Sequence, residues 1–332
     1  MTRPFSLLLI GAVLLANAIE AQAPPCKPCG GVHVTDPTAA AQALNGAPRL
    51  EDQVPLYVAW SVELAQATSA ASNTTEIVNA GAVPWLRLRF RTPSPILEHA
   101  DRFAEELAAA TEIAQGTAPR THFQVIWQPE SKSSSDAGTN ASPLSAEQYA
   151  YLFKRVSVAL TGVNAESRVI TAPLPSDLSF LETFYGEETA AYLDGLAFGP
   201  TSPARLAPIL SRASELDPGR PIVLDGAPWP QDPWLVLSDA ARWTEAGASL
   251  VLFSVDPSTP LDNEDFLPLK ILAREFQGDL PRPSFETQWC HRSLELCAWG
   301  RLEPPDHCEE PSRGGQSGPH LSGQSAQAAS AH

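Results

Sequence analysis

Short apolar runs alternate along this chain with longer stretches that carry apolar residues at helical spacing. A short apolar run between polar, Gly or Pro residues is typical of a buried strand. Tyr149, Phe153, Val156 and Leu160 recur every three or four residues and predict an amphipathic helix. The alternation of strands with helices predicts a parallel β/α architecture.

Eight strand–helix units can be counted in this pattern. We therefore predict an α/β fold, a (β/α)8 TIM barrel over residues 31–278, close to the roughly 250 residues typical of such barrels. Because the first strand is short, a seven-unit incomplete barrel and an open doubly wound sheet remain alternatives. The predicted strands cover residues 32–34, 56–62, 85–90, 123–128, 168–172, 195–199, 222–225 and 250–255.

The N-terminus has the order of a secretory signal. Arg3 precedes an apolar run over residues 7–15, and small residues follow at 16–18. This order predicts a signal peptide over residues 1–21 and a secreted protein, extracellular or periplasmic. The apolar run is too short to span a bilayer, and no second long apolar run follows, so we expect no membrane span.

The five cysteines lie near the two ends of the chain, at positions 26, 29, 290, 297 and 308. In an oxidising compartment this number predicts two disulfides and one remaining thiol, in a pairing that the sequence leaves open. A second C-x-x-C is missing, so we expect no metal site. We interpret residues 279–308 as a short disulfide-stapled appendage. Residues 309–332 are rich in Gly, Ser, Gln and Ala, which is typical of a disordered tail.

The charge excludes one class of partner. Acidic residues outnumber basic ones 38 to 22, giving a net charge of −16, so we expect no nucleic-acid partner. Phosphate-binding loops, G-x-S-x-G elbows and H-E-x-x-H motifs do not occur in the sequence, and we expect no cofactor. The oligomeric state stays open.

Acidic residues follow several predicted strands, where the active sites of such barrels form. They are Glu63, Glu130, Asp225 and Asp256. Two carboxylates across a barrel mouth are what glycoside hydrolysis requires, one as proton donor and one as nucleophile or base.

Residues 113–255 resemble the clan-A glycoside hydrolases, which include β-xylosidases and endoglucanases. The fourth strand of that family ends in W-N-E-P, and this chain has W-Q-P-E at 127–130. The seventh has P-I-x-x-T-E-x-G-W, and this chain has P-I-V-L-D-G at 221–226, followed by Trp229. The resemblance implies a barrel in which Glu130 is the acid/base, Asp225 is the nucleophile or base, and Gln128 contacts the sugar.

The chain departs from the family at these motifs. An alignment without gaps places Pro129 at the acid/base position, and a residue one place later in a strand points to the other face unless a bulge intervenes. Asp225 is one methylene shorter than the expected Glu, and Gly199 and Thr201 replace a His and a Tyr. These changes predict that hydrolysis is weak or lost.

Other side chains are candidates for the mouth. Arg87 and Arg89 alternate with apolar residues at period two, so they are expected to point into the barrel. A buried guanidinium group requires a partner, and the candidates are Glu63, Glu130 and Asp225. Trp229 and Trp234 lie on a Pro-rich loop, where they either stack on sugar rings or pack against the next helix.

We interpret the chain as a secreted glycoside hydrolase-like barrel that binds an extracellular β-linked polysaccharide or oligosaccharide, a pseudoenzyme with weak or lost hydrolysis. One alternative is an active retaining or inverting glycosidase that uses Glu130 and Asp225. A second is a scaffold or partner-binding barrel without a sugar site, which full pairing of the mouth carboxylates with arginines would favour.

Overall fold

A computed structural model describes residues 29–47, 56–64, 69–128 and 145–275. The chain divides into a unit over residues 1–279 and a second over 280–332, and all the described residues belong to the first. The predicted signal peptide, appendage and tail lie outside the described residues, as do Pro129, Glu130 and every cysteine but Cys29.

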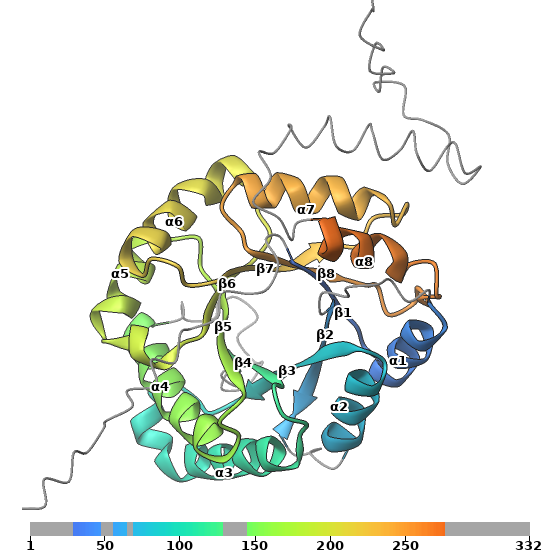
Figure 1. Cartoon of the computed structure of the whole chain (residues 1–332). Helices are drawn as coiled ribbons and strands as arrows, with labels where there is room; N and C mark the ends of the chain where they lie inside the picture. The colour runs from blue at the N-terminus through green and yellow to red at the C-terminus, as the bar shows by residue number, and fades with distance from the viewer. Residues whose placement is uncertain (1–28, 48–55, 65–68, 129–144, 276–332) are drawn as a thin grey trace, which may run out of the picture. The chain divides into compact units, whose positions relative to one another are not determined.

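Eight parallel strands form a closed barrel in chain order (Figure 1). The predicted (β/α)8 barrel is therefore confirmed, and both the incomplete barrel and the open sheet are wrong. The strands are β1 (Cys29–His33), β2 (Leu56–Glu63), β3 (Ala82–Phe90), β4 (His122–Trp127), β5 (Arg168–Leu174), β6 (Gly195–Phe198), β7 (Ile222–Pro228) and β8 (Leu250–Ser254).

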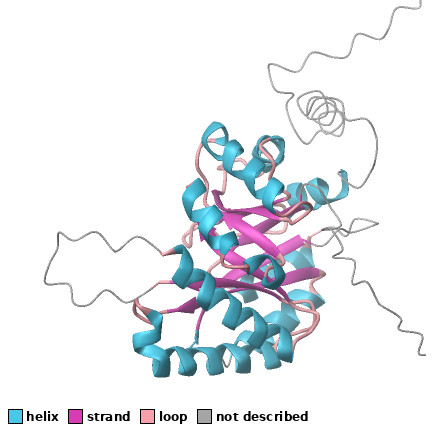
Figure 2. Ribbon diagram, turned by 90° about the vertical axis from the view of Figure 1, so that its left-hand side faces the viewer, coloured by secondary structure: helices cyan, strands magenta, loops and turns pink. Residues whose placement is uncertain are grey.

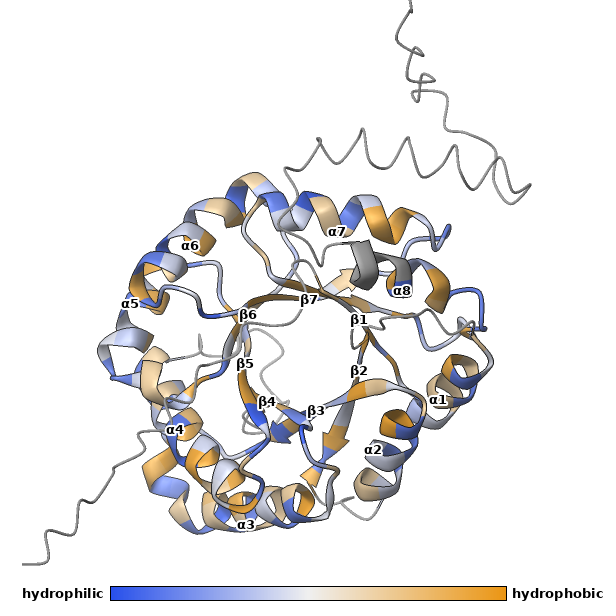
Figure 3. Ribbon diagram, viewed as in Figure 1, coloured by the Kyte–Doolittle hydropathy of each residue, from blue (hydrophilic) through white to orange (hydrophobic). Residues whose placement is uncertain are grey.

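Helices surround the strands, which lie at the centre in both views (Figures 1 and 2). In Figure 3 each helix of this ring carries hydrophobic and hydrophilic residues along its length, as amphipathic helices do. The helices are α1 (Pro37–Gly46), α2 (Ala70–Asn79), α3 (Ala100–Gly116), α4 (Ala146–Val163), α5 (Leu178–Gly186), α6 (Pro203–Leu216), α7 (Leu235–Glu245) and α8 (Phe266–Glu275), with short 3-10 helices at Ile96–His99 and Thr189–Tyr192. None of the helices in these ranges is long and apolar enough to cross a bilayer.

The first strand, weakly marked in the sequence, closes the barrel. It pairs with β2 on one side and β8 on the other, and Gly31 lies opposite both Tyr57 and Leu252. A Cβ added to Gly31 would lie 2.6 Å from Leu252 Cδ2 and 2.7 Å from the Tyr57 carbonyl oxygen. Closure therefore requires a residue without a side chain at this position.

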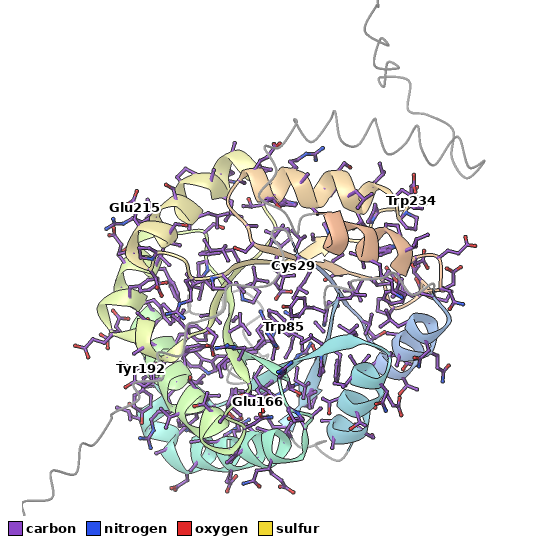
Figure 4. All side chains as sticks on the ribbon, viewed as in Figure 1. Cys29, Trp85, Glu166, Tyr192, Glu215 and Trp234 are labelled. Carbon is purple, nitrogen blue, oxygen red and sulfur yellow. The ribbon has the colours of Figure 1, made fainter. Side chains whose placement is uncertain are left out.

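Alternation along β3 separates an apolar outer face from the barrel lumen. Leu86, Leu88 and Phe90 are fully buried, and the Phe90 ring lies 6.3 Å from that of Phe103 on α3. The residues between them therefore point into the barrel. Trp85, labelled near the centre of Figure 4, belongs to a buried apolar cluster in the lumen.

This cluster fills the end of the barrel where the strands begin. It contains Tyr57, Ala59 and Trp85, together with Ile170 and Val223. The Trp85 ring meets the Tyr57 ring edge-on at 5.8 Å. The apolar floor closes one end of the lumen, so the polar inward residues that follow it in each strand lie towards the end where active sites form in this fold.

Replacement of Gly31 tests the closure of the barrel. Gly31→Ala is expected to lower the free energy of unfolding by about 2 kcal/mol or more, because a backbone carbonyl lies in the path of the new methyl group. Gly162→Ala on α4 is the matched control, since a Cβ there meets nothing within 4 Å and Ala is the better helix former. Urea unfolding of both variants checks this, and an equal effect of the two would contradict it.

Candidate functional site

An ion pair spans the lumen above the apolar floor. Arg87 comes from β3 and Asp225 from β7, which lie on opposite sides of the eight-strand ring. Arg87 Nη2 lies 3.2 Å from Asp225 Oδ2, and the two side chains are 17% and 1% exposed. A charge as buried as that of Asp225 requires such a partner.

Gln124 on β4 connects this pair to the floor. Its Nε2 donates hydrogen bonds to Asp225 Oδ2 at 2.9 Å and to the Thr171 carbonyl oxygen at 3.0 Å. Its Oε1 accepts a hydrogen bond from Trp85 Nε1 at 3.4 Å. Asp225 Oδ2 is therefore shared between a guanidinium and an amide, and both donors are fixed by their own strands.

His33, the last residue of β1, lies on the other side of Arg87. Arg87 Nη1 is 3.2 Å from both ring nitrogens of His33. Burial, reinforced by the charges of Arg87 and Arg89, lowers the pKa of His33 from 6.5 to about 4. His33 is therefore neutral at pH 7, and adds no charge to the site.

Burial raises the pKa of Asp225, and the charge of Arg87 and the hydrogen bond from Gln124 offset part of that rise. Asp225 Oδ1 and Arg87 Nε are buried and have no hydrogen-bond partner among the described residues. The pair thus retains one acceptor and one donor that no described residue satisfies.

The chain turns sharply just after Asp225. The register of β7 against β8 shifts between Asp225 and Ala227, and the intervening Gly226 has φ +91°. A bulge of this kind changes the direction in which neighbouring side chains point. Glycine suits this position because residues with a side chain rarely adopt a positive φ.

A second ion-pair group lies further along β3 and joins it to β2. Arg89 Nη1 donates to Glu63 Oε1 at 3.1 Å, and Arg89 Nη2 donates to Ser61 Oγ at 3.0 Å. Arg91, one residue beyond β3, donates from Nε and Nη2 to Glu63 Oε2 at 3.2 and 2.9 Å. Both oxygens of Glu63 are thus engaged by guanidinium donors.

The structure joins most of the residues that the sequence singled out. Arg87 meets Asp225 and Arg89 meets Glu63, as the alternation and the charges suggested. Glu130 lies outside the described residues, so its distance to Asp225 stays open. Gln128 is exposed at the end of β4, and its backbone N–H donates to the Phe90 carbonyl oxygen at 2.8 Å.

The two tryptophans after β7 occupy different places. Trp229 is half-buried, and its ring meets that of Phe253 on β8 edge-on at 6.1 Å. Its backbone N–H donates to the Ser254 carbonyl oxygen at 3.1 Å, which fixes it at the strand ends. Trp234 is the N-cap residue of α7, and Figure 4 places it at the outer edge of the helix ring. Of the two, Trp229 is therefore the one held at the strand ends. Its ring packs on the helix-facing side of β8, because Leu250 and Leu252, which alternate with Phe253, belong to the lumen cluster.

Sequence analysis did not single out His33, Ser61, Gln124 or Arg91 as members of the site. Each is a polar residue at an inward position of a strand or just beyond it, so the period-two alternation used for Arg87 could have found them. Within the described ranges, no group of three or more His, Cys, Asp or Glu side chains is arranged to hold a metal ion.

Comparisons with known proteins support the fold. The chain matches no family model, and no curated protein matches it in sequence. A GH5-4 broad specificity endoglucanase from Clostridium acetobutylicum is similar in structure, with a TM-score of 0.50 and 10% identity over 75% of this chain and 94% of that chain. A GH26 beta-mannanase from Bacteroides ovatus has a TM-score of 0.49 and 14% identity over 77% of this chain and 91% of that chain.

A methylaspartate ammonia lyase from Clostridium tetanomorphum has a TM-score of 0.46 and 7% identity, over 83% of this chain and 60% of that chain. These proteins are glycoside hydrolases and a lyase, and each is at most 14% identical to this chain. The likeness to the endoglucanase concerns the fold alone, so the chemistry is argued from the site.

Removal of Arg87 tests the ion pair across the lumen. Arg87→Met is expected to lower the free energy of unfolding by about 3 kcal/mol, because Asp225 would remain buried without its cation. Arg87→Met combined with Asp225→Asn should lose less than the sum of the two single variants. Arg242→Met is the control. The Arg242 side chain, paired with Asp239 on α7, is 65% exposed, so its removal should change the free energy of unfolding little. Additive losses in urea unfolding would contradict the pairing.

The pKa of His33 predicts an effect of pH. Between pH 6.5 and about 4 the unfolded chain binds a proton at His33 that the folded chain does not, so stability is complete above pH 6.5 and falls as the pH falls. His33→Gln should therefore lose less thermal stability than the wild type between pH 7 and pH 5. Thermal unfolding at both pH values checks this, and equal losses in the two proteins would contradict it.

Proposed function

We propose that this protein is a secreted barrel that binds an extracellular β-linked glycan at its mouth and hydrolyses it weakly or not at all. The observation that carries the proposal is the state of Asp225, whose side chain is 1% exposed and whose Oδ2 is held by Arg87 and Gln124. A nucleophile must reach the anomeric carbon of a sugar, and a carboxyl group buried in this way is poorly placed to do so.

The rest of the mouth supports loss of hydrolysis in the same way. Glu63, the other described carboxylate among the proposed site residues, has both oxygens engaged by Arg89 and Arg91. Of the described carboxylates that the sequence analysis noted at the strand ends, Asp225 and Glu63 are paired with guanidinium groups, and Asp256 accepts hydrogen bonds from Ser258 in its own turn. A glycosidase needs two carboxyl groups about 5 to 9.5 Å apart, one of which carries a proton.

Binding is supported by the fold and by an aromatic side chain. The barrel fold is similar to that of the GH5-4 broad specificity endoglucanase from C. acetobutylicum, a glycan-cleaving enzyme. Trp229 is half-buried beside β8, and an aromatic face at a barrel mouth suits the apolar face of a sugar ring. We assign Gln128, Trp229 and the arginines to glycan contacts, and leave Trp234 as a packing residue.

A scaffold without a sugar site is the second candidate. It is favoured by the ion pairs themselves, because arginines that neutralise carboxylates in a barrel need no ligand to explain them. An active glycosidase would require Arg87 to release Asp225, and Glu130 to aim into the mouth. Binding and turnover measurements separate these three functions.

A panel of β-linked oligosaccharides tests the proposal. Titration calorimetry of the mature protein should show saturable binding of at least one of them, and Trp229→Ala should weaken it about tenfold or more. Trp234→Ala is the matched control, and should leave the affinity unchanged.

A reducing-end assay on the same samples should detect no turnover, or only slow turnover. Release of reducing ends that Asp225→Asn abolishes would contradict the loss of hydrolysis. Absence of binding across the panel would overturn glycan binding and leave the scaffold.

A further inference from the structure

Three arginines line the inward side of β3 and its continuation, and we call Arg87, Arg89 and Arg91 the arginine ladder. The described acidic partners of the ladder are two carboxylates, Asp225 and Glu63. Since His33 is neutral at pH 7, this group of charges has a net charge of +1. The excess is notable in a chain whose net charge is −16.

The excess charge lies at the solvent end of the ladder. The exposed fraction of the side chain rises from 17% at Arg87 to 34% at Arg89 and 47% at Arg91. Arg87 is the one arginine of the ladder that pairs with Asp225. Glu63 pairs with two of them, accepting from Arg89 through Oε1 and from Arg91 through Oε2. One carboxylate between two guanidinium groups leaves one positive charge that it does not neutralise, and that charge is accessible.

Among the described residues, other acidic groups near the strand ends are engaged elsewhere. Glu106 on α3 accepts hydrogen bonds from the backbone N–H groups of Arg91 and Thr92, and lies 3.7 Å from Arg102. Four aspartates at the same end of the barrel accept hydrogen bonds from backbone N–H groups of their own turns, two to three residues away: Asp36, Asp177, Asp232 and Asp256. These contacts hold the acidic side chains in their own loops and leave the ladder's excess charge in place.

We propose that the glycan bound at this mouth is acidic, and that the carboxylate of a uronic acid residue binds the outer end of the arginine ladder at Arg89 and Arg91. This inference rests on the proposed glycan binding. A guanidinium group is planar and presents paired N–H donors that match a carboxylate, and it stays charged at every physiological pH. The ligand carboxylate would supply the negative charge that Glu63 alone cannot provide for both arginines.

The test compares two oligosaccharides that differ in one group. The first is a β-linked oligosaccharide that carries glucuronic acid, and the second is the same oligosaccharide after reduction of the carboxyl group to an alcohol. Calorimetry should show at least tenfold tighter binding of the acidic form. The difference should shrink as salt is raised from 50 to 500 mM, because the Debye length falls from about 14 Å to about 4 Å.

Variants of the ladder locate the effect. Arg91→Gln should reduce the preference for the acidic form to about twofold or less. Arg91→Lys keeps the charge and loses the planar donors, so its preference should lie between those of the wild type and of Arg91→Gln. Arg242→Gln is the matched control, because it removes an exposed, singly paired arginine from α7 without touching the mouth.

The outcomes separate the two claims. Equal affinity for the acidic and the reduced oligosaccharide would overturn the acidic preference and leave glycan binding intact. Failure of both to bind, together with failure of the wider panel, would overturn the proposed function itself. An equal effect of Arg242→Gln and Arg91→Gln would assign the preference to overall charge and contradict a site at the ladder.

Discussion

The interaction on which this structure depends is the ion pair between Arg87 and Asp225. The two residues come from strands on opposite sides of the ring, and their contact crosses the lumen directly above an apolar floor. An unpaired charge buried in the lumen would lower the free energy of unfolding, and each residue of the pair offsets this desolvation penalty for the other. Gln124 and His33 complete this polar layer, and through them the pair contacts β1, β4 and β5 as well.

The same contacts underlie our proposal that the mouth binds a glycan and hydrolyses it weakly or not at all. Catalysis by two carboxyl groups requires that one gives up a proton and that the other reaches the substrate. In this barrel Asp225 is enclosed, and Glu63 is divided between two arginines. Three arginines on β3 and its continuation contact these carboxylates, and guanidinium groups favour the recognition of anions.

Much of the fold could be predicted from local patterns, because the spacing of apolar residues within a short segment distinguishes strands from helices. The inward direction of Arg87 and Arg89 followed from the same alternation. The composition of the polar layer could not be predicted in full, since the level at which His33, Gln124 and Asp225 meet is set by the register of strands far apart in sequence. The bulge at Gly226 and the sharing of Glu63 by Arg91 are likewise consequences of closure, and no single segment reveals them.

The most direct test of the ion pair across the lumen is a crystal structure of the mature protein that resolves ordered water. The account predicts a direct contact between the Arg87 guanidinium and the Asp225 carboxylate, with Asp225 closed off from bulk solvent. An Arg87 side chain turned away, with Asp225 open to solvent and facing a second carboxyl group about 5 to 9.5 Å away, would contradict it.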